Sequence, residues 1–235
     1  MKALTLLLAV IIPFPLCLFR MKKYGISLKK MLLIYIVVST VGAIGACVGA
    51  IISNESALSQ RLYGLMLFDT ALLFALSPLL KVRLADMGDF VIVPIMAVCF
   101  SSKISCLVQG CCYGVTLRGI PWFSEIRFPS VIFEMVIWGM MTLLLLAIER
   151  SQLAKGALWP IGMIWFGIAR FAVDFLRGSA WEKRVFVLGL TGGQFWSLVV
   201  LLGGAIYLYI VLMHRFQRKP RVQEWLYAGI GIVSK

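Results

Sequence analysis

Three cysteines lie within seven residues in the stretch CLVQGCCYG, at Cys106, Cys111 and Cys112. Thiols at this density could bind a metal, form a disulfide or act as a nucleophile. A zinc site needs a second Cys or Cys/His pair, which the sequence lacks. A bridge between the adjacent Cys111 and Cys112 would be strained. A reactive thiol stays open as an interpretation, although no neighbouring residue suggests a base that would activate it.

A second group of residues is better suited to chemistry. Arg170, Asp174 and Arg177 follow one another at spacings of four and three in GIARFAVDFLRG. These spacings predict three side chains on one helix face, with two guanidiniums sharing one carboxylate. The surplus positive charge would suit a phosphate, which arginine binds in a planar bidentate geometry. The alternative is a structural ladder whose last arginine reaches the membrane interface.

Further ionisable residues interrupt other apolar stretches. Asp69, Lys103 and Glu134 each lie in such a run, where a charge costs at least about 2.5–3.5 kcal/mol and normally faces a partner. Lys103 either extends its amine to the interface or adds to the same electropositive pocket. Glu134, which follows a proline in RFPSVIFEM, is either an ion-pair partner of a basic residue or a general base.

The elements that position these residues are predicted to be membrane-spanning helices. Of the 235 residues, 61% are hydrophobic and 14% charged, against about 45–50% and 25% in soluble domains. The sequence therefore predicts an all-α integral membrane protein with a single polytopic domain over residues 1–235. Seven apolar stretches approach the roughly 20 residues that a span needs; they cover about 3–19, 31–52, 62–80, 90–108, 130–148, 157–176 and 194–213. The first resembles a signal peptide but lacks a small-residue cleavage site, so it is expected to be a span.

The distribution of positive charge predicts an orientation. With the N-terminus outside, the inner segments hold 14 lysines and arginines, and the outer tail and loops hold 7. Such an excess marks cytoplasmic loops, so we expect the C-terminus in the cytoplasm and the loops 109–129 and 177–193 outside. The net charge of +13 then reflects contact with anionic lipid headgroups, and no nucleic-acid partner is expected.

Five stretches together resemble the prolipoprotein diacylglyceryl transferase family. The resemblance runs from about Tyr63 to the end of the seventh span; it rests on GDF at 88–90, KISCLVQGCCYG at 103–114, FPSVIFE at 128–134, GIARFAVDFLRG at 167–178 and TGGQFWSL at 191–198. It implies a multi-pass enzyme of the bacterial cytoplasmic membrane. Such an enzyme transfers the diacylglyceryl group of phosphatidylglycerol to the lipobox cysteine of a lipoprotein precursor as a thioether, without metal or cofactor.

The resemblance also implies roles for particular residues. Tyr63, Arg170 and Glu134 are the expected catalytic residues. The expected substrate-binding residues are Asp89, Lys103, Gln109, Gly110, Gly114, Asp174, Arg177 and Gln194. The two glycines suit positions where the backbone approaches closely or takes positive φ.

The sequence departs from the family pattern at several polar positions. Tyr63 stands where the family has a histidine, and the only histidine of the chain, His214, lies at the inner end of the last span. Apolar Phe128, Val131 and Phe133 also replace polar family residues. Two alternatives follow: a related transferase that uses another phospholipid or acceptor, and a lipid-binding or transport protein without enzymatic activity.

Overall fold

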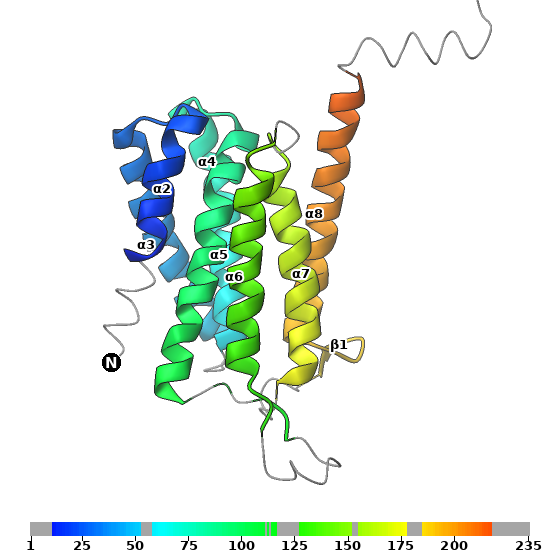
Figure 1. Cartoon of the computed structure of the whole chain (residues 1–235). Coiled ribbons are helices and arrows are strands. Elements are labelled where there is room, and N and C mark those ends of the chain that lie inside the picture. Colours follow the sequence, from blue (N-terminus) through cyan, green and yellow to red (C-terminus); the bar gives the residue numbers. More distant parts are fainter. Residues whose placement is uncertain are drawn as a thin grey trace, which may run out of the picture.

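The described part of the chain forms a bundle of seven α-helices (Figure 1). The structure, a computed structural model, describes residues 11–52, 58–110, 112, 114–116, 127–151, 155–177 and 185–217, and 83% of it is helical. The helices are α2 (Pro13–Met21), α3 (Leu28–Ile52), α4 (Leu58–Leu80), α5 (Leu84–Gln109), α6 (Ser130–Ile148), α7 (Leu158–Leu176) and α8 (Gly192–Gln217). A 3-10 helix (Lys22–Tyr24) follows α2, and the short antiparallel strands β1 (Val185–Val187) and β2 (Leu190–Thr191) precede α8.

The predicted spans from 31–52 onward each fall on one of the helices α3 to α8. Four helical segments among the described residues are long and apolar enough to cross a membrane: α5, α6, α7 and Gly192–Arg215 of α8. This agrees with an all-α membrane protein. The predicted first span lies partly outside the described residues, because the description begins within it at residue 11.

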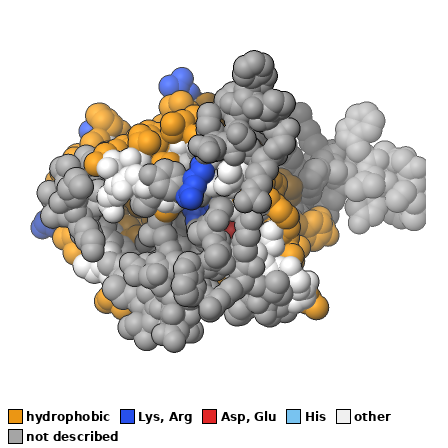
Figure 2. Space-filling model, turned by 90° about the horizontal axis from the view of Figure 1, so that it is seen from below, with side chains coloured by type: hydrophobic (Ala, Val, Ile, Leu, Met, Phe, Trp, Pro, Cys, Tyr) orange, Lys and Arg blue, Asp and Glu red, His pale blue; other side chains and the backbone are white. Residues whose placement is uncertain are grey.

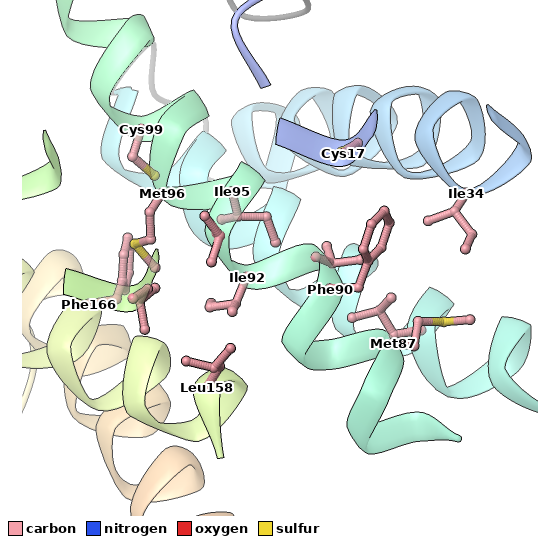
Figure 3. Close-up of a cluster of buried hydrophobic side chains, with 14 of the residues drawn as sticks. Cys17, Ile34, Met87, Phe90, Ile92, Ile95, Met96, Cys99, Leu158 and Phe166 are labelled. Carbon is pink, nitrogen blue, oxygen red and sulfur yellow. The ribbon is translucent and has the colours of Figure 1, made fainter. Parts of the chain in front are cut away.

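Helix α5 is the centre of the bundle and packs against α2, α4, α6 and α7. Met87, Phe90, Ile92 and Met96 project from it into the core, where Phe166 of α7 joins them (Figure 3). Apolar side chains such as Leu143 of α6 and Ile206 of α8 are instead largely exposed. Exposed apolar helix faces of this extent match a lipid environment.

The end of the bundle where α2 and α6 finish is held by a buried ion pair. Arg20 Nε donates to both carboxylate oxygens of Glu149, at 2.9 and 3.1 Å. Arg20 Nη1 donates to the carbonyl of Phe90 at 2.6 Å. That carbonyl lacks its usual helical donor because the residue four positions later is Pro94, which has no N–H. Arg20 therefore satisfies a backbone group that α5 itself leaves open.

A hydrogen bond between Tyr24 and Glu149 shifts the pKa values of both groups in opposite directions. Burial favours the neutral form of Glu149, but hydrogen bonds from Arg20 and Tyr24 and nearby positive charge outweigh it and lower the pKa of Glu149. Burial and the hydrogen bond to Glu149, at 2.7 Å, raise the pKa of Tyr24. Glu149 is therefore the charged acceptor of this network.

Candidate active site

Glu134 of α6 lies at the centre of a buried charge cluster that also contains Lys103, Arg170 and Arg177. Lys103 Nζ is 2.7 Å from Glu134 Oε2. Arg177 donates through Nη2 and Nε to Glu134 Oε1, at 2.9 and 3.2 Å. Arg170 Nη1 is 3.8 Å from Oε2. We call these four residues the Glu134 cluster.

Three helices supply the Glu134 cluster at the end of the bundle where α5 finishes. Lys103 lies two turns before the end of α5, and Glu134 lies one turn into α6. Arg170 lies in the second half of α7, and Arg177 is the extended residue that caps its end (φ −81°, ψ 139°). The view onto this end shows basic and acidic side chains near its centre, amid hydrophobic and undescribed atoms (Figure 2).

Arg170 is the least satisfied member of the cluster. Its side chain is only 1% exposed. Within the described part of the chain, Nε, Nη1 and Nη2 are buried without a hydrogen-bond partner. A buried guanidinium left unpaired is costly. Among the described residues, three cations face one carboxylate here, and counting Asp174, one turn after Arg170, still leaves a surplus positive charge. The cluster therefore has the charge and the N–H donors to bind an anion with several oxygen atoms.

The prediction that Arg170 and Arg177 share the carboxylate of Asp174 is wrong. In the described residues, the ion pairs of Arg170 and Arg177 are both with Glu134. Asp174 accepts a hydrogen bond from the Thr191 hydroxyl instead. The reason is that Arg177 lies beyond the last helical residue of α7, so its extended backbone directs it toward α6. The shared carboxylate of the sequence prediction therefore exists, but α6 provides it.

An apolar cavity of about 430 Å³ begins one helical turn deeper in the bundle than Arg170. Phe166, which lines it, precedes Arg170 by four residues on the same face of α7. The other walls come from α4, α5 and α8, and they include Met96 and Trp196. Asp69 is the one ionisable residue of the lining, and its Oδ1 is buried without a hydrogen-bond partner among the described residues. Cavities of this size and lining bind small apolar ligands or cofactors.

The sequence that forms this cluster and this cavity matches a known protein family. A family model described as prolipoprotein diacylglyceryl transferase matches residues 3–210. The chain belongs to this family.

Curated relatives support the membership at modest identity. A phosphatidylglycerol–prolipoprotein diacylglyceryl transferase of Wolbachia pipientis wMel is 33% identical over 122 residues, which are 46% of each chain. The phosphatidylglycerol–prolipoprotein diacylglyceryl transferase 2 of Clostridium perfringens is 29% identical over 136 residues, which are 54% of this chain and 52% of the relative. The matching segments thus span about half the length of these members of the prolipoprotein diacylglyceryl transferase family.

The structure bears out the backbone requirements predicted for two glycines in KISCLVQGCCYG at 103–114, the family signature. We call residues 110–116, which follow α5, the signature loop. Gly110 ends α5 with φ 60°, and its N–H caps the helix. Gly114 passes so close to its neighbours that an added Cβ would lie 2.5 Å from the Phe128 carbonyl oxygen and 2.9 Å from that of Leu176. Backbone hydrogen bonds from Gly114 to Phe128 and from Val115 to Leu176 hold the loop there. The signature loop therefore joins α6 to the end of α7; Gln109 before it is exposed.

Gln194 forms two hydrogen bonds with Thr191 at the start of α8. Its side-chain oxygen accepts from the Thr191 N–H, and its own N–H donates to the Thr191 hydroxyl, both at 3.1 Å. This reciprocal pair is a capping box at the start of α8. Because the same hydroxyl donates to Asp174, Thr191 connects α7 to α8. Sequence reasoning missed Thr191, although the T-x-x-Q pattern of TGGQ is the signal for such a cap.

Asp89 is not brought to the Glu134 cluster. It precedes Lys103 by fourteen residues on the same helix, which corresponds to about 21 Å of helix axis. Its carboxylate accepts hydrogen bonds from the N–H groups of Gly156 and Trp159, at and just before the start of α7. Asp89 therefore fastens α5 to α7 at the opposite end of the bundle.

The side chains of Tyr63 and Cys111, both named from the sequence, lie outside the described part of the structure. Tyr63 belongs to the second turn of α4, but its side chain lies outside the described residues. Cys111 also lies outside them. The role of Tyr63 in place of the family histidine stays a prediction.

Proposed function

We propose that this chain transfers the diacylglyceryl group of phosphatidylglycerol to the cysteine thiol of a lipobox-bearing lipoprotein precursor. The names of its relatives state this donor and this class of acceptor. In the transfer, the acceptor sulfur forms a bond to the glycerol carbon of the diacylglyceryl group. The bond from that carbon to the phosphate oxygen breaks, and glycerol phosphate leaves with the electron pair. The thiol proton passes to a base at the site or to water, and finally to the released phosphate or solvent.

The observation that carries the proposal is the unsatisfied guanidinium of Arg170. Its buried N–H groups have no hydrogen-bond partner in the described part of the chain, and a phosphate would satisfy them in bidentate fashion. As the carbon–oxygen bond breaks, negative charge increases on the leaving phosphate. A preorganised cation in a dry site stabilises that charge in the transition state more than in the ground state. Arg170 is therefore the proposed catalytic residue for leaving-group stabilisation.

The cavity beneath the cluster supports a phospholipid as the donor. With the phosphate at Arg170, the diacylglyceryl group extends toward Phe166 and the apolar cavity of about 430 Å³. Burial of acyl methylene groups there contributes about 0.8 kcal/mol for each one. One molecule would thus occupy both the anion site and the cavity.

Glu134 is proposed to organise the site rather than to act as its base. Its carboxylate already faces Lys103, Arg170 and Arg177, and a carboxylate stabilised by three cations has little tendency to take a proton. Activation of the acceptor thiol then needs another group or the positive field itself. Tyr63, near the start of α4, is proposed to act there as a hydrogen-bond donor or weak base.

The same proposal includes the placement in the bacterial cytoplasmic membrane. We propose seven spans, with the N-terminus outside and the C-terminus in the cytoplasm. The basic residues around Arg20, Lys81 and Lys155 gather at one end of the bundle, which supports the cytoplasm on that side. The Glu134 cluster at the other end would then meet precursors after their export.

A transfer assay tests the proposal. The full chain is reconstituted in liposomes with labelled phosphatidylglycerol and a synthetic lipobox peptide, and thioether product and released glycerol phosphate are measured. Arg170→Ala should lower the rate by roughly 10²–10³-fold, the loss typical of removing one oxyanion donor. Arg83→Ala is the matched control, since Arg83 is an exposed arginine at the opposite end. Wild-type activity in Arg170→Ala would refute the assignment of the phosphate site.

A further inference from the structure

Two of the clustered cysteines approach each other closely. The sulfur atoms of Cys106 and Cys112 are 3.7 Å apart. Cys106 lies in the last turn of α5 and is buried, and Cys112 lies in the loop that follows and is partly exposed. An S–S bond is about 2.0 Å long, so closure requires the two sulfur atoms to move together by about 1.7 Å.

The backbone conformation of Gly110 and of Cys112 itself accompanies the approach of the two thiols. Gly110 and Cys112 both have positive φ, at 60° and 61°, and the Cys112 sulfur lies next to Cys106 in the last turn of α5. For a residue other than glycine this conformation is uncommon and needs support from its surroundings. Ser130 gives that support, because its hydroxyl donates to the Cys112 carbonyl at 2.6 Å.

We propose that Cys106 and Cys112 form a redox-active pair that closes into a disulfide and fastens the signature loop to α5. This inference goes beyond the proposed transferase activity and does not rest on it. Neither thiol belongs to the Glu134 cluster. Lys103 lies one turn before Cys106, and Ser130 lies one turn before Glu134. Formation of the disulfide would therefore stabilise the connection between the end of α5 and the start of α6.

Thiol–disulfide exchange with an external disulfide supplies the two-electron oxidation. The Cys112 thiolate, the more accessible of the two, attacks the external disulfide and releases one thiol, which leaves a mixed disulfide. The Cys106 thiolate then attacks the Cys112 sulfur and releases the second thiol. The two cysteines lose two protons and two electrons in total, and the external disulfide is reduced to two thiols.

The test uses the full chain in detergent with oxidised glutathione. Remaining thiols are alkylated after denaturation, and linked peptides are identified by mass spectrometry. The expected product is a peptide pair joined through Cys106 and Cys112, lighter by two hydrogen atoms and restored by dithiothreitol. It should form equally in Cys111→Ser, and it should be absent from Cys106→Ser and from Cys112→Ser. The core thiol of Cys99 should stay fully alkylated and serves as an internal control.

Three outcomes would overturn the inference. Cys106 could remain quantitatively alkylated in the oxidised wild-type protein, which would show that the pair does not close. It could be joined to Cys111 instead of Cys112. Glutathione could remain attached to Cys112 without progress to the internal bond. Because the wild-type chain alone decides among these results, a folding defect in a cysteine variant does not remove the test.

Discussion

Lys103 of α5 and Glu134 of α6 form a buried ion pair, with 2.7 Å between Nζ and Oε2. The two residues are nearly inaccessible to solvent, and Arg177 from the end of α7 contacts the other oxygen of the same carboxylate. A single acidic side chain therefore holds together the ends of three helices. The energetics of this end of the bundle depend on that one group.

Glu134→Gln should be strongly destabilising. The substitution keeps the side-chain volume but leaves Lys103, Arg170 and Arg177 without a countercharge at this position. Removing one partner of a buried ion pair typically costs about 3–5 kcal/mol. We expect a clear fall in the thermal unfolding temperature of the detergent-solubilised protein. Asp86→Asn is the control: its ion pair with the exposed Arg83 is of the surface kind, worth about 0–1 kcal/mol.

Arg170→Met should separate stability from activity. The guanidinium of Arg170 is buried without a hydrogen-bond partner among the described residues, and its ion pair with Glu134 is long at 3.8 Å. An apolar replacement removes these unsatisfied buried N–H groups, while Lys103 and Arg177 still neutralise Glu134. We expect an unfolding temperature equal to or above that of the wild type, together with loss of diacylglyceryl transfer. The unfolding temperature and the rate of transfer are measured on the same preparation. A large loss of stability would mean that Arg170 is mainly structural.

The helices were predictable from sequence because apolar runs of about 20 residues leave few other structures in a membrane. The positive φ of Gly110 and the close approach at Gly114 were also predictable, since only glycine meets both demands easily. The partner of Arg177 was not, because spacing along α7 says nothing about which neighbouring helix supplies a carboxylate. Asp89 shows the converse: resemblance grouped it with Lys103, whereas fourteen residues of helical rise separate the two.

Gly114→Ala should lower the rate of transfer by displacing the backbone of the signature loop. The added Cβ would lie 2.5 Å from the Phe128 carbonyl oxygen, a distance that real contacts do not reach, so the loop must move away from α6 and α7. Because Arg177 pairs with Gly114 in a backbone bridge, we expect its contact with Glu134 to be disturbed and transfer to fall at least tenfold. Gly139→Ala is the matched control, since its added Cβ would meet only the Phe100 ring at 3.4 Å, an ordinary van der Waals contact. Equal activity of the two variants would contradict the proposed role of the loop.

Glu149, which pairs with Arg20 at the end of the bundle opposite Glu134, should make the thermal stability of the protein sensitive to acid. Its pKa is lowered in the folded protein, from about 4.3 in an unfolded chain. A carboxyl group with a lowered folded pKa contributes its full stabilisation above the unfolded pKa and loses it as the pH falls through the folded pKa. The wild type should therefore unfold at a higher temperature than Glu149→Gln at pH 7. The difference should shrink below about pH 4, as the wild-type carboxyl takes up a proton. Thermal unfolding of both proteins from pH 3 to 8 measures this, and a difference that stays constant over that range would show that the charge of Glu149 is not what Arg20 and Tyr24 stabilise.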